Sequence, residues 1–463
     1  MNRSHRIALL SEHASPAALL GGEDAGGQNV YVDELSRHLG RLGHAVDVFA
    51  RRDRADAPEV IDWAPGVRIV NLEAGPPRPL PKDYIWPLMP AFRDAFLDFM
   101  ARDGTRYDLL HGNFWMSGWV ATELRLALGI PAVQIFHALG KTKRRHQGPA
   151  DTSPPGRVWV ELRTVDEVER LIAQCPSERA ELVGDYGAAP DKVALIPAGV
   201  NTDTFRPVAH AEARRRIGLD LDRPVIVYVG RILPRKDVRN VVRAVARLVR
   251  CWEDAGRPGD APLLLVVGGE KAEPDPVATP EIGALQRLAA QLGVAEHVCF
   301  TGQRPQGILR DYYGAGDVVV TTPWYEPFGL TPLEGMACGR PVVGAAVGGI
   351  AFTVADGETG FLVPPRDPEA LAGRLRQLLA RPELRARMGR AARARVEREF
   401  TWATTAGRVA ALYEEALASP AASERHTSGD EQPATVDAPL GAFPQAAGVA
   451  PLADAAAYAE ADS

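Results

Sequence analysis

Short apolar runs alternate with helix-length amphipathic segments along most of this chain, and this alternation limits the folds open to it. Each run has the length of one buried strand, and a helical pattern follows most of them. The runs lie at residues 6–10, 45–50, 67–71, 108–110, 131–136 and 192–196, and then at 225–229, 263–267, 297–301, 317–321 and 341–344. The pattern predicts βαβ units and mostly parallel sheets, which is an α/β fold.

The runs form two sets, separated by residues 197–207, which contain Gly199 and two prolines and read as a hinge. A chain of 463 residues is too long for one ordinary core. We therefore expect two doubly wound Rossmann-like domains facing across a cleft, at residues 1–200 and 207–398. A C-terminal helix should span 399–418. Residues 419–463, rich in Ala, Pro, Ser, Glu and Asp, should form a disordered tail.

Composition excludes several classes of partner. A net charge of -6 gives no electrostatic footprint for nucleic acid. The apolar run before Ser11 is too short for a signal peptide or a membrane span, so we expect a cytoplasmic protein without integral membrane association. The four cysteines, Cys175, Cys251, Cys299 and Cys338, lie far apart, which suggests neither a zinc site nor a disulfide framework. The sequence does not indicate an oligomeric state.

Two carboxylates eight positions apart, Glu326 and Glu334, follow the 317–321 run, at the edge where open α/β sheets bind ligands. Residues 331–334, Thr-Pro-Leu-Glu, fit a capping box, which would give Glu334 a structural role. A hydrolase could use both carboxylates on one bond. A helix start between them instead favours contacts with two parts of one long ligand, such as a sugar and a ribose.

Three cations, Arg231, Arg235 and Lys236, follow the 225–229 run and precede a helix expected to begin near Asp237. Cations at a helix N-terminus oppose its dipole, so their presence there suggests an anion in the same place. A diphosphate suits the planar fork of arginine and the point charge of lysine. The alternative is a solvated basic loop.

A glycine-rich turn at residues 21–29 lies between the first strand and the first helix and could bring backbone close to a ligand. It is not G-x-G-x-x-G, so a nicotinamide cofactor is poorly supported, and we expect no cofactor. The Asp-x-Asp at residues 220–222 precedes a strand and so lies at the wrong end of its sheet for a metal site. We expect no metal.

His111 and His137 directly follow predicted strands, so both should lie at the sheet edge facing the cleft. Residues 141–146 after His137 form a dense basic run, which could attract a phosphorylated acceptor or be a solvated loop. The candidate residues of both halves all follow predicted strands, and this convergence favours a ligand site between two domains.

Four motifs in combination carry a family resemblance: Glu326 with Glu334, Gly230-Arg231 with Lys236, Gly26-Gly27-Gln28, and His-Ala-Leu-Gly at 137–140. Over residues 5–417 the chain resembles the GT-B retaining glycosyltransferases of family 4. That group contains the sucrose-phosphate synthases and the inositol-phosphate glycosyltransferase of mycothiol synthesis.

The resemblance implies a role for each donor-side residue. Glu326 would hold hydroxyls of the donor sugar, helped by backbone N–H groups around Phe328, Gly329 and Leu330. Glu334 would hold the ribose. Arg231 and Lys236 would stabilise the leaving diphosphate, with Gly26 and Gly27 facing it. His137 would lie beside the transferred hexosyl group, and neither an enzyme nucleophile nor a metal is required. The sequence does not specify the base or the sugar of the donor, and UDP-glucose is our working donor.

On the acceptor side, Arg157 and Glu161 match an Arg-x-x-x-Glu pair that helps bind acceptor phosphate in phosphosugar-using relatives, although they could form an ordinary surface ion pair. With these two we group Gln28, His111, Lys141 and Lys143. The implied acceptor is a small phosphorylated sugar or an inositol.

Other readings stay open. A sugar-nucleotide 2-epimerase or a non-enzymatic nucleotide-sugar sensor would keep the nucleotide site. A glycosyltransferase could also act on a lipid or polysaccharide acceptor. For a lipid, the expected helix at 87–102 carries too few basic residues, and its phenylalanines Phe92, Phe96 and Phe99 should face the core.

Overall fold

The computed structural model describes residues 4–18, 26–219, 222–257 and 261–419. Three sequence-based expectations therefore fall wholly or partly outside the described residues. They are the disordered tail, most of the glycine-rich turn, and the first part of the Asp-x-Asp at 220–222. The compact unit discussed below lies within residues 1–427.

The first sheet, within the described residues, has eight strands in the order β3-β4-β2-β1-β5-β6-β7-β8. All neighbours pair in parallel except β3, which forms an antiparallel hairpin with β4 at one edge. The strands are β1 Arg6–Leu10, β2 Ala45–Arg51, β3 Val60–Ala64, β4 Val67–Leu72, β5 Leu109–Asn113, β6 Ala132–Ile135, β7 Arg170–Ala173 and β8 Val193–Leu195.

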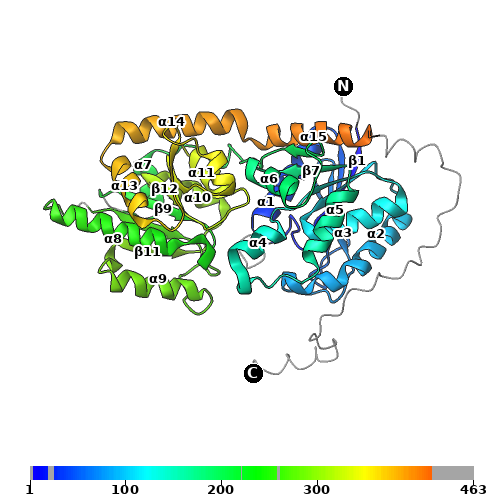
Figure 1. Cartoon of the computed structure of the whole chain (residues 1–463), viewed down its shortest axis with the longest axis horizontal. Coiled ribbons are helices and arrows are strands. Elements are labelled where there is room, and N and C mark those ends of the chain that lie inside the picture. Colours follow the sequence, from blue (N-terminus) through cyan, green and yellow to red (C-terminus); the bar gives the residue numbers. More distant parts are fainter. Residues whose placement is uncertain (1–3, 19–25, 220–221, 258–260, 420–463) are drawn as a thin grey trace. The chain divides into compact units, whose positions relative to one another are not determined.

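Helices cover both faces of this sheet (Figure 1). They are α1 Gly27–Arg41, α2 Met89–Asp103, α3 Phe114–Leu128, α4 Gly140–Gln147, α5 Arg157–Glu167 and α6 Pro176–Gly184, with short 3-10 turns η1 Lys82–Tyr84, η2 Trp86–Leu88 and η3 Gly148–Ala150. The phenylalanines Phe92, Phe96 and Phe99 of α2 are buried, as predicted. They pack with the β2 ring Phe49, so that face of α2 is committed to the core.

The second sheet is wholly parallel, with six strands in the order β11-β10-β9-β12-β13-β14 among the described residues. This is the doubly wound order: successive strands are added outward on one side from β9 to β11 and on the other side from β12 to β14, so the switch point lies between β9 and β12. The strands are β9 Val225–Val229, β10 Leu263–Val267, β11 Val298–Gly302, β12 Val318–Thr321, β13 Val342–Ala345 and β14 Gly360–Val363. Every residue of β9, β10, β12 and β13 is buried, as expected for strands covered on both faces.

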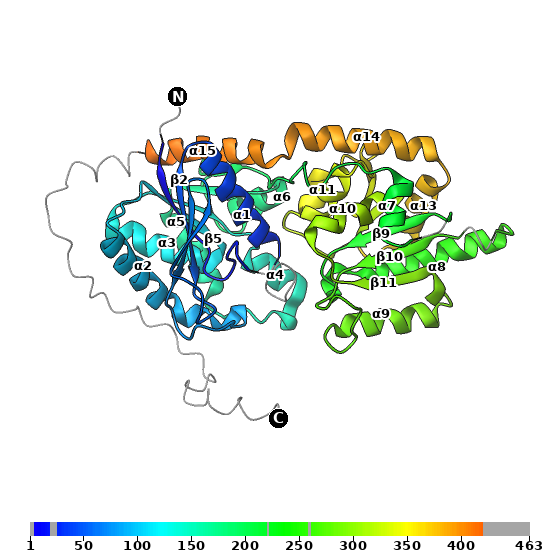
Figure 2. The same ribbon diagram turned by 180° about the vertical axis from the view of Figure 1, so that it is seen from behind.

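The helices after β8 follow in chain order, and α7 to α14 lie with the second sheet, whereas α15 lies with the first (Figure 2). They are α7 His210–Arg216, α8 Val238–Asp254, α9 Pro280–Gln291, α10 Gln306–Ala315, α11 Leu330–Ala337, α12 Gly348–Thr353, α13 Pro368–Leu379, α14 Pro382–Glu399 and α15 Trp402–Leu417, with 3-10 turns η4 Pro234–Lys236 and η6 Ala295–His297. Helix α15 lies within residues 399–418, where the sequence analysis expected a C-terminal helix.

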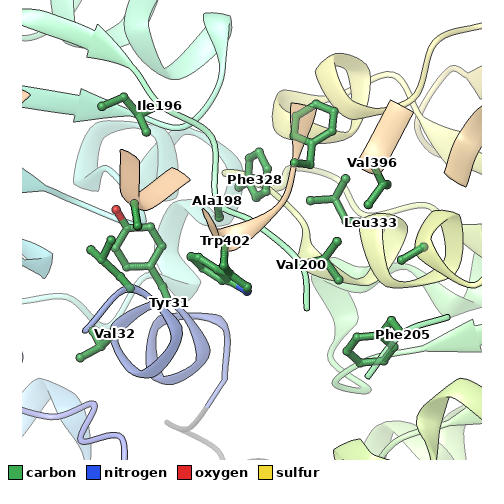
Figure 3. Close-up of a cluster of buried hydrophobic side chains, with 14 of the residues drawn as sticks. Tyr31, Val32, Ile196, Ala198, Val200, Phe205, Phe328, Leu333, Val396 and Trp402 are labelled. Carbon is green, nitrogen blue, oxygen red and sulfur yellow. The ribbon is translucent and has the colours of Figure 1, made fainter. Parts of the chain in front are cut away.

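The segment after β8 contacts the start of α15. The Val200 N–H donates to the Phe400 carbonyl at 2.8 Å, and a Cβ at Gly199 would lie 2.5 Å from the backbone nitrogen of Trp402. Helix α15 then packs against α1, and the two enclose Tyr31 and Trp402. Figure 3 shows these two rings with Val200 and Phe328 in one buried apolar cluster. The domain limits at 200 and 207 remain predictions.

A short strand was also expected at residues 171–173, where β7 lies, but two strands were not predicted from the sequence, β3 and β14. The first is an edge strand whose residues are mostly half exposed, and Pro65-Gly66 turn it into β4. The second has only four residues. Neither shows a long apolar run, and tertiary pairing at a sheet edge, rather than local pattern, makes them strands.

Candidate active site

The switch point of the second sheet brings together the two motifs that the sequence singled out there. The segment after β9 contains Arg231 and Lys236, and the loop after β12 contains Glu326. Because β9 and β12 are adjacent and parallel, both segments leave the same edge of the sheet. Ligands of doubly wound domains bind at this point.

Lys236 and Glu326 form an ion pair between these segments. Their side chains are only 18% and 14% exposed. Burial opposes ionisation of Glu326, but Lys236 and Arg235 outweigh it and hold the pKa of that carboxyl below its usual range. The site therefore holds an ionised carboxylate against a concentrated positive charge, and a positive excess of this kind suits a diphosphate.

Arg231 adds to this charge, since it also favours the ionised form of Glu326 and so lowers that pKa. Its backbone carbonyl accepts a 2.8 Å hydrogen bond from the Tyr228 hydroxyl on β9. Arg235 lies over the ring of Tyr325, with its guanidinium carbon 5.4 Å from the ring centroid. All three predicted cations therefore gather around one carboxylate.

The loop after Glu326 leads directly into α11, which begins at Leu330 with Gly329 as its N-cap at φ 84. The first N–H groups of a helix have no partner within it, so they can meet a ligand there. Helix α12 braces this loop: Gly349 donates to the Glu326 carbonyl at 3.1 Å, and a Cβ at Gly348 would lie 1.9 Å from that oxygen.

The capping-box prediction for Glu334 is wrong. Because α11 begins at Leu330, Thr331 is already inside the helix, and the cap residue Gly329 has no side chain to accept a hydrogen bond. The buried carboxylate of Glu334 instead accepts a 2.7 Å hydrogen bond from the Tyr313 hydroxyl of α10. Burial raises the pKa of Glu334 to about 7, and the Tyr313 hydrogen bond offsets part of that rise.

On the first sheet, the equivalent switch lies between β1 and β5. Gln28, at the start of α1, reaches this point: its side-chain nitrogen lies 3.2 Å from the Ser11 hydroxyl and 3.4 Å from the Asn113 carbonyl. The neighbouring residues Gly26 and Gly27 form the N-cap and first turn of α1. A Cβ at Gly27 would lie 3.7 Å from Leu330, so this helix start faces the start of α11.

The two histidines differ in position. His137 lies just beyond β6, half-buried, as expected for a residue at the sheet edge. The placement expected for His111 is wrong, because β5 extends to Asn113 and His111 lies inside it, fully buried. Its Nδ1 lies 2.6 Å from the Tyr413 hydroxyl of α15. A ring without solvent exposure does not contact a small acceptor, so we do not carry His111 into the proposal.

Arg157 and Glu161 are a buried pair rather than a surface one. The Arg157 Nε lies 2.8 Å from Glu161, and the guanidinium also meets the Ala138 carbonyl and the Ser153 hydroxyl. Glu161 accepts the Gly140 N–H with both oxygens at 3.0 Å. The pair therefore fixes the chain just after His137.

The basic run forms helix α4 rather than a loop. Lys143 pairs with Asp151 at 3.0 Å and donates to the Ser153 hydroxyl at 2.9 Å. Because Ser153 also accepts from Arg157, two cations converge on one hydroxyl. Lys141 points elsewhere, since its ammonium donates to the Asp185 carbonyl and lies over the ring of Tyr186.

A cavity of about 240 Å³ lies between segments that follow strands β6 and β7 of the first sheet and segments that follow β12 and β13 of the second. The first sheet's side contributes Ala138, Leu139, Thr142, His146, Cys175, Ser177, Glu178 and Glu181, and the second contributes Trp324, Tyr325, Glu326, Pro327, Val347 and Gly348. Direct contacts cross it: Gln147 donates to the Tyr325 hydroxyl, and the Cys175 thiol lies 3.2 Å from the Pro327 carbonyl.

Three residues of the site, Asn113, Glu178 and Tyr313, were not predicted from the sequence. Burial raises the pKa of Glu178 to about 8, so this cavity residue is protonated at neutral pH. Glu178 lies three residues after Cys175, the N-cap of α6, and an acidic residue at that position is a sequence signal for the start of a helix. Asn113 was missed because the strand expected at 108–110 stopped too early. Tyr313 lies within the helical pattern of α10 and gave no local signal.

Two doubly wound domains, with a cation–carboxylate pair at the switch point of the second, define a glycosyltransferase of the GT-B class. The family models agree: residues 25–204 match "Glycosyltransferase Family 4" and residues 210–395 match "Glycosyl transferases group 1". The chain belongs to this family of glycosyltransferases, and it is a transferase enzyme.

Named relatives cover nearly the whole chain. A D-inositol 3-phosphate glycosyltransferase of Acidothermus cellulolyticus is 39% identical over 92% of this chain and 93% of its own length. The enzyme of the same name from Streptomyces scabiei is 39% identical over 90% of this chain and 92% of its own length. Among solved structures, sucrose-phosphate synthase from Thermosynechococcus elongatus has a TM-score of 0.80 at 36% identity, covering 89% of this chain and 99% of that one.

More distant structures share the fold. Anabaena HepE, solved in complex with UDP and glucose, has a TM-score of 0.69 at 18% identity, covering 89% of this chain and all of that one. In the part of the chain described here, no helix is long and apolar enough to cross a membrane.

Proposed function

We propose that this enzyme transfers a hexosyl group from a nucleotide diphosphate sugar, with UDP-glucose as the first donor to test. The acceptor is a hydroxyl of a small phosphorylated sugar or inositol, and the anomeric configuration is retained. The observation that carries this proposal is the Lys236–Glu326 ion pair, which lies at the switch point of the second sheet on a cavity shared with the first.

On the donor side, the ionised carboxylate of Glu326 accepts hydrogen bonds from sugar hydroxyls, and backbone N–H groups of Phe328, Gly329 and Leu330 bind beside it. Glu334 accepts hydrogen bonds from the ribose hydroxyls. Only one of its carboxyl oxygens accepts the Tyr313 hydrogen bond, so the other oxygen can serve the ribose. Arg231 and Lys236 neutralise the diphosphate as it leaves. The Gly26 and Gly27 amides at the start of α1 approach it from the other domain.

Retention follows when the acceptor hydroxyl attacks on the face from which the diphosphate departs. In that step the bond from the anomeric carbon to the diphosphate oxygen breaks, a bond to the acceptor oxygen forms, and the departing diphosphate takes the acceptor proton. Glu326 is paired with Lys236 and is a poor nucleophile for a double displacement. His137 lies beside the transferred hexosyl group.

The acceptor side is the cationic corner formed by Arg157 and Lys143, which meet at the Ser153 hydroxyl. Glu161 holds Arg157 in place, and Gln28 completes the acceptor set, whereas Lys141, which is tied to Asp185 and Tyr186, is left out of it. The relatives include an inositol phosphate glycosyltransferase and a sucrose-phosphate synthase, and both names refer to a phosphorylated small molecule. The cytoplasm remains the proposed location.

A screen of nucleotide diphosphate release tests the proposal. UDP- and ADP-glucose and related donors are each combined with D-inositol 3-phosphate, with hexose phosphates, and with the matching unphosphorylated compounds. Release that requires a phosphorylated acceptor is expected. Interconversion of the donor without acceptor would instead support an epimerase, and release only with lipid or polysaccharide acceptors would remove the acceptor assignment.

A further inference from the structure

Asn113 and His137 lie at the ends of two adjacent parallel strands, β5 and β6. Asn113 is fully buried, and its side-chain oxygen Oδ1 lies 3.0 Å from Nε2 of His137. This contact belongs to no motif that the sequence singled out. It joins a residue without an assigned role to the histidine placed beside the transferred sugar.

The orientation of the Asn113 amide follows from its other contacts. Its Nδ2 lies 3.3 Å from the Leu10 carbonyl and 3.4 Å from the His111 carbonyl, and a carbonyl can only accept a hydrogen bond. The amide nitrogen therefore faces these two carbonyls, and Oδ1 faces His137. Since Oδ1 accepts, Nε2 of His137 must donate and so carries the proton.

The neutral ring has one proton, so its Nδ1 is then a bare acceptor. No hydrogen bond to this Nδ1 occurs among the described residues. Burial lowers the pKa of His137 to about 3, and the nearby His111 and His13 act in the same direction. The ring therefore stays neutral at working pH, and the choice of tautomer decides what it can bind.

Backbone strain surrounds the contact. His137 has φ 58 and Phe114, which follows Asn113, has φ 79, and both are non-glycine residues in the left-handed region. The Ala138 N–H also donates to the Phe136 carbonyl at 2.6 Å, which closes a tight turn around His137. Strain of this kind is concentrated at functional sites.

A second contact fixes the plane of the ring. Tyr31 of α1 meets His137 edge-on, with centroids 4.9 Å apart and planes at 75°. Tyr31 in turn packs against Trp402 at 5.6 Å, within the cluster shown in Figure 3. With Asn113 holding one nitrogen and Tyr31 holding one face, the imidazole has a single orientation.

We propose that Asn113 is a positioning residue that fixes His137 in the Nε2–H tautomer and so presents Nδ1 as an acceptor for a hydroxyl of the transferred sugar. This inference rests on the proposed function, because that function places His137 beside the sugar. It adds a direction to the contact: the sugar hydroxyl donates and the histidine accepts.

The tautomer can be measured without any substrate. Nitrogen-15 NMR of the full chain, labelled at histidine, distinguishes a protonated from a bare ring nitrogen. We expect a protonated Nε2 and a bare Nδ1 for His137 in the wild type and in Asn113→Asp, which keeps an acceptor oxygen. We expect a mixture of tautomers in Asn113→Ala. A protonated Nδ1 in the wild type would overturn the proposal.

Kinetics with donors that each lack one sugar hydroxyl supply the second readout. The wild type should discriminate against one such donor, and Asn113→Ala should lose that discrimination and about tenfold to a hundredfold of kcat, the range for removing an orienting partner of a ligand histidine. Asn113→Asp should recover part of the lost discrimination and part of the lost kcat. Unchanged discrimination in Asn113→Ala would count against the role.

Asn71→Ala is the matched control, because Asn71 is also a buried asparagine at the end of a strand in this sheet, and its amide donates to the Pro58 carbonyl at 2.8 Å. It should lose stability without changing the tautomer or the discrimination. If the wild type turns over no nucleotide sugar, the proposed function fails, while the tautomer result still stands by itself.

Discussion

The Tyr313 hydroxyl donates a 2.7 Å hydrogen bond to the carboxylate of Glu334, joining helix α10 to α11 in the buried core of the second domain. This contact replaces the helix-cap role that local sequence suggested. It also leaves a buried carboxyl whose pKa, raised by burial, is about 7. A carboxyl that titrates near neutrality gives a measurable link between pH and stability.

Glu334→Gln should change the pH dependence of unfolding. The ordinary value for glutamate is 4.5, so between that pH and about 7 the unfolded chain is ionised while the folded chain keeps its proton. The contribution of Glu334 to the free energy of unfolding therefore falls as pH rises through this window. Denaturant unfolding should show the wild type losing up to about 3 kcal/mol relative to Glu334→Gln between pH 4.5 and 8.

The exposed Glu358→Gln is the control for this measurement, and its unfolding profile should run parallel to the wild type. If the unfolding free energy of Glu334→Gln also ran parallel to that of the wild type across pH, the raised pKa of Glu334 would be contradicted. Under the proposed function, the donor KM of the wild type should also fall as pH rises through about 7, since the ionised carboxylate is the better acceptor for ribose hydroxyls.

Lys236→Met should lower kcat by about a hundredfold or more, because it removes a charge that acts on the departing diphosphate. It should also cost about 3 kcal/mol of stability by leaving Glu326 buried and unpaired. Adding Glu326→Gln should recover stability but not activity. Arg247→Met, on the exposed side of α8, is the control. An undiminished kcat would remove Lys236 from the leaving-group role.

Gly349→Ala tests the bracing of the loop after Glu326. A Cβ at Gly349 would lie 2.1 Å from the Phe328 carbonyl oxygen and 2.3 Å from its Cα, so the loop must move. We expect the donor KM to rise about tenfold and the unfolding free energy to fall by about 1–3 kcal/mol. Gly373→Ala in α13 has open space around it and should stabilise the chain slightly. Equal changes in donor KM and in unfolding free energy for both variants would show that contacts of Gly349 do not hold the loop after Glu326.

Lys143→Ala and Lys141→Ala form a matched pair on one helix. Lys143 meets Ser153 beside Arg157, whereas Lys141 is tied to Asp185 and Tyr186. Steady-state kinetics with a phosphorylated acceptor should therefore show a several-fold higher acceptor KM for Lys143→Ala, with the donor KM unchanged. The acceptor KM of Lys141→Ala should change little. A larger rise in acceptor KM for Lys141→Ala than for Lys143→Ala would place the acceptor phosphate near Lys141 instead.

The sequence predicted the layout of the sheets because buried parallel strands leave long apolar runs. It also placed Lys236, Glu326 and His137 correctly at strand ends, since position after a strand is a local property. His111 was misplaced because two polar residues, His111 and Asn113, lie inside a buried strand and ended the apolar run early. Partners such as Tyr413 for His111 lie 302 residues away, and no local pattern encodes them.

The stereochemistry of transfer decides whether this enzyme is a retaining glycosyltransferase. Proton NMR of the enzyme with a nucleotide α-glucoside and the best phosphorylated acceptor reports the anomeric configuration of the product as it forms. We expect one new α-linked product, formed together with free nucleotide diphosphate and only when acceptor is present. A β-linked product, or a donor that changes its sugar without acceptor, would contradict this expectation.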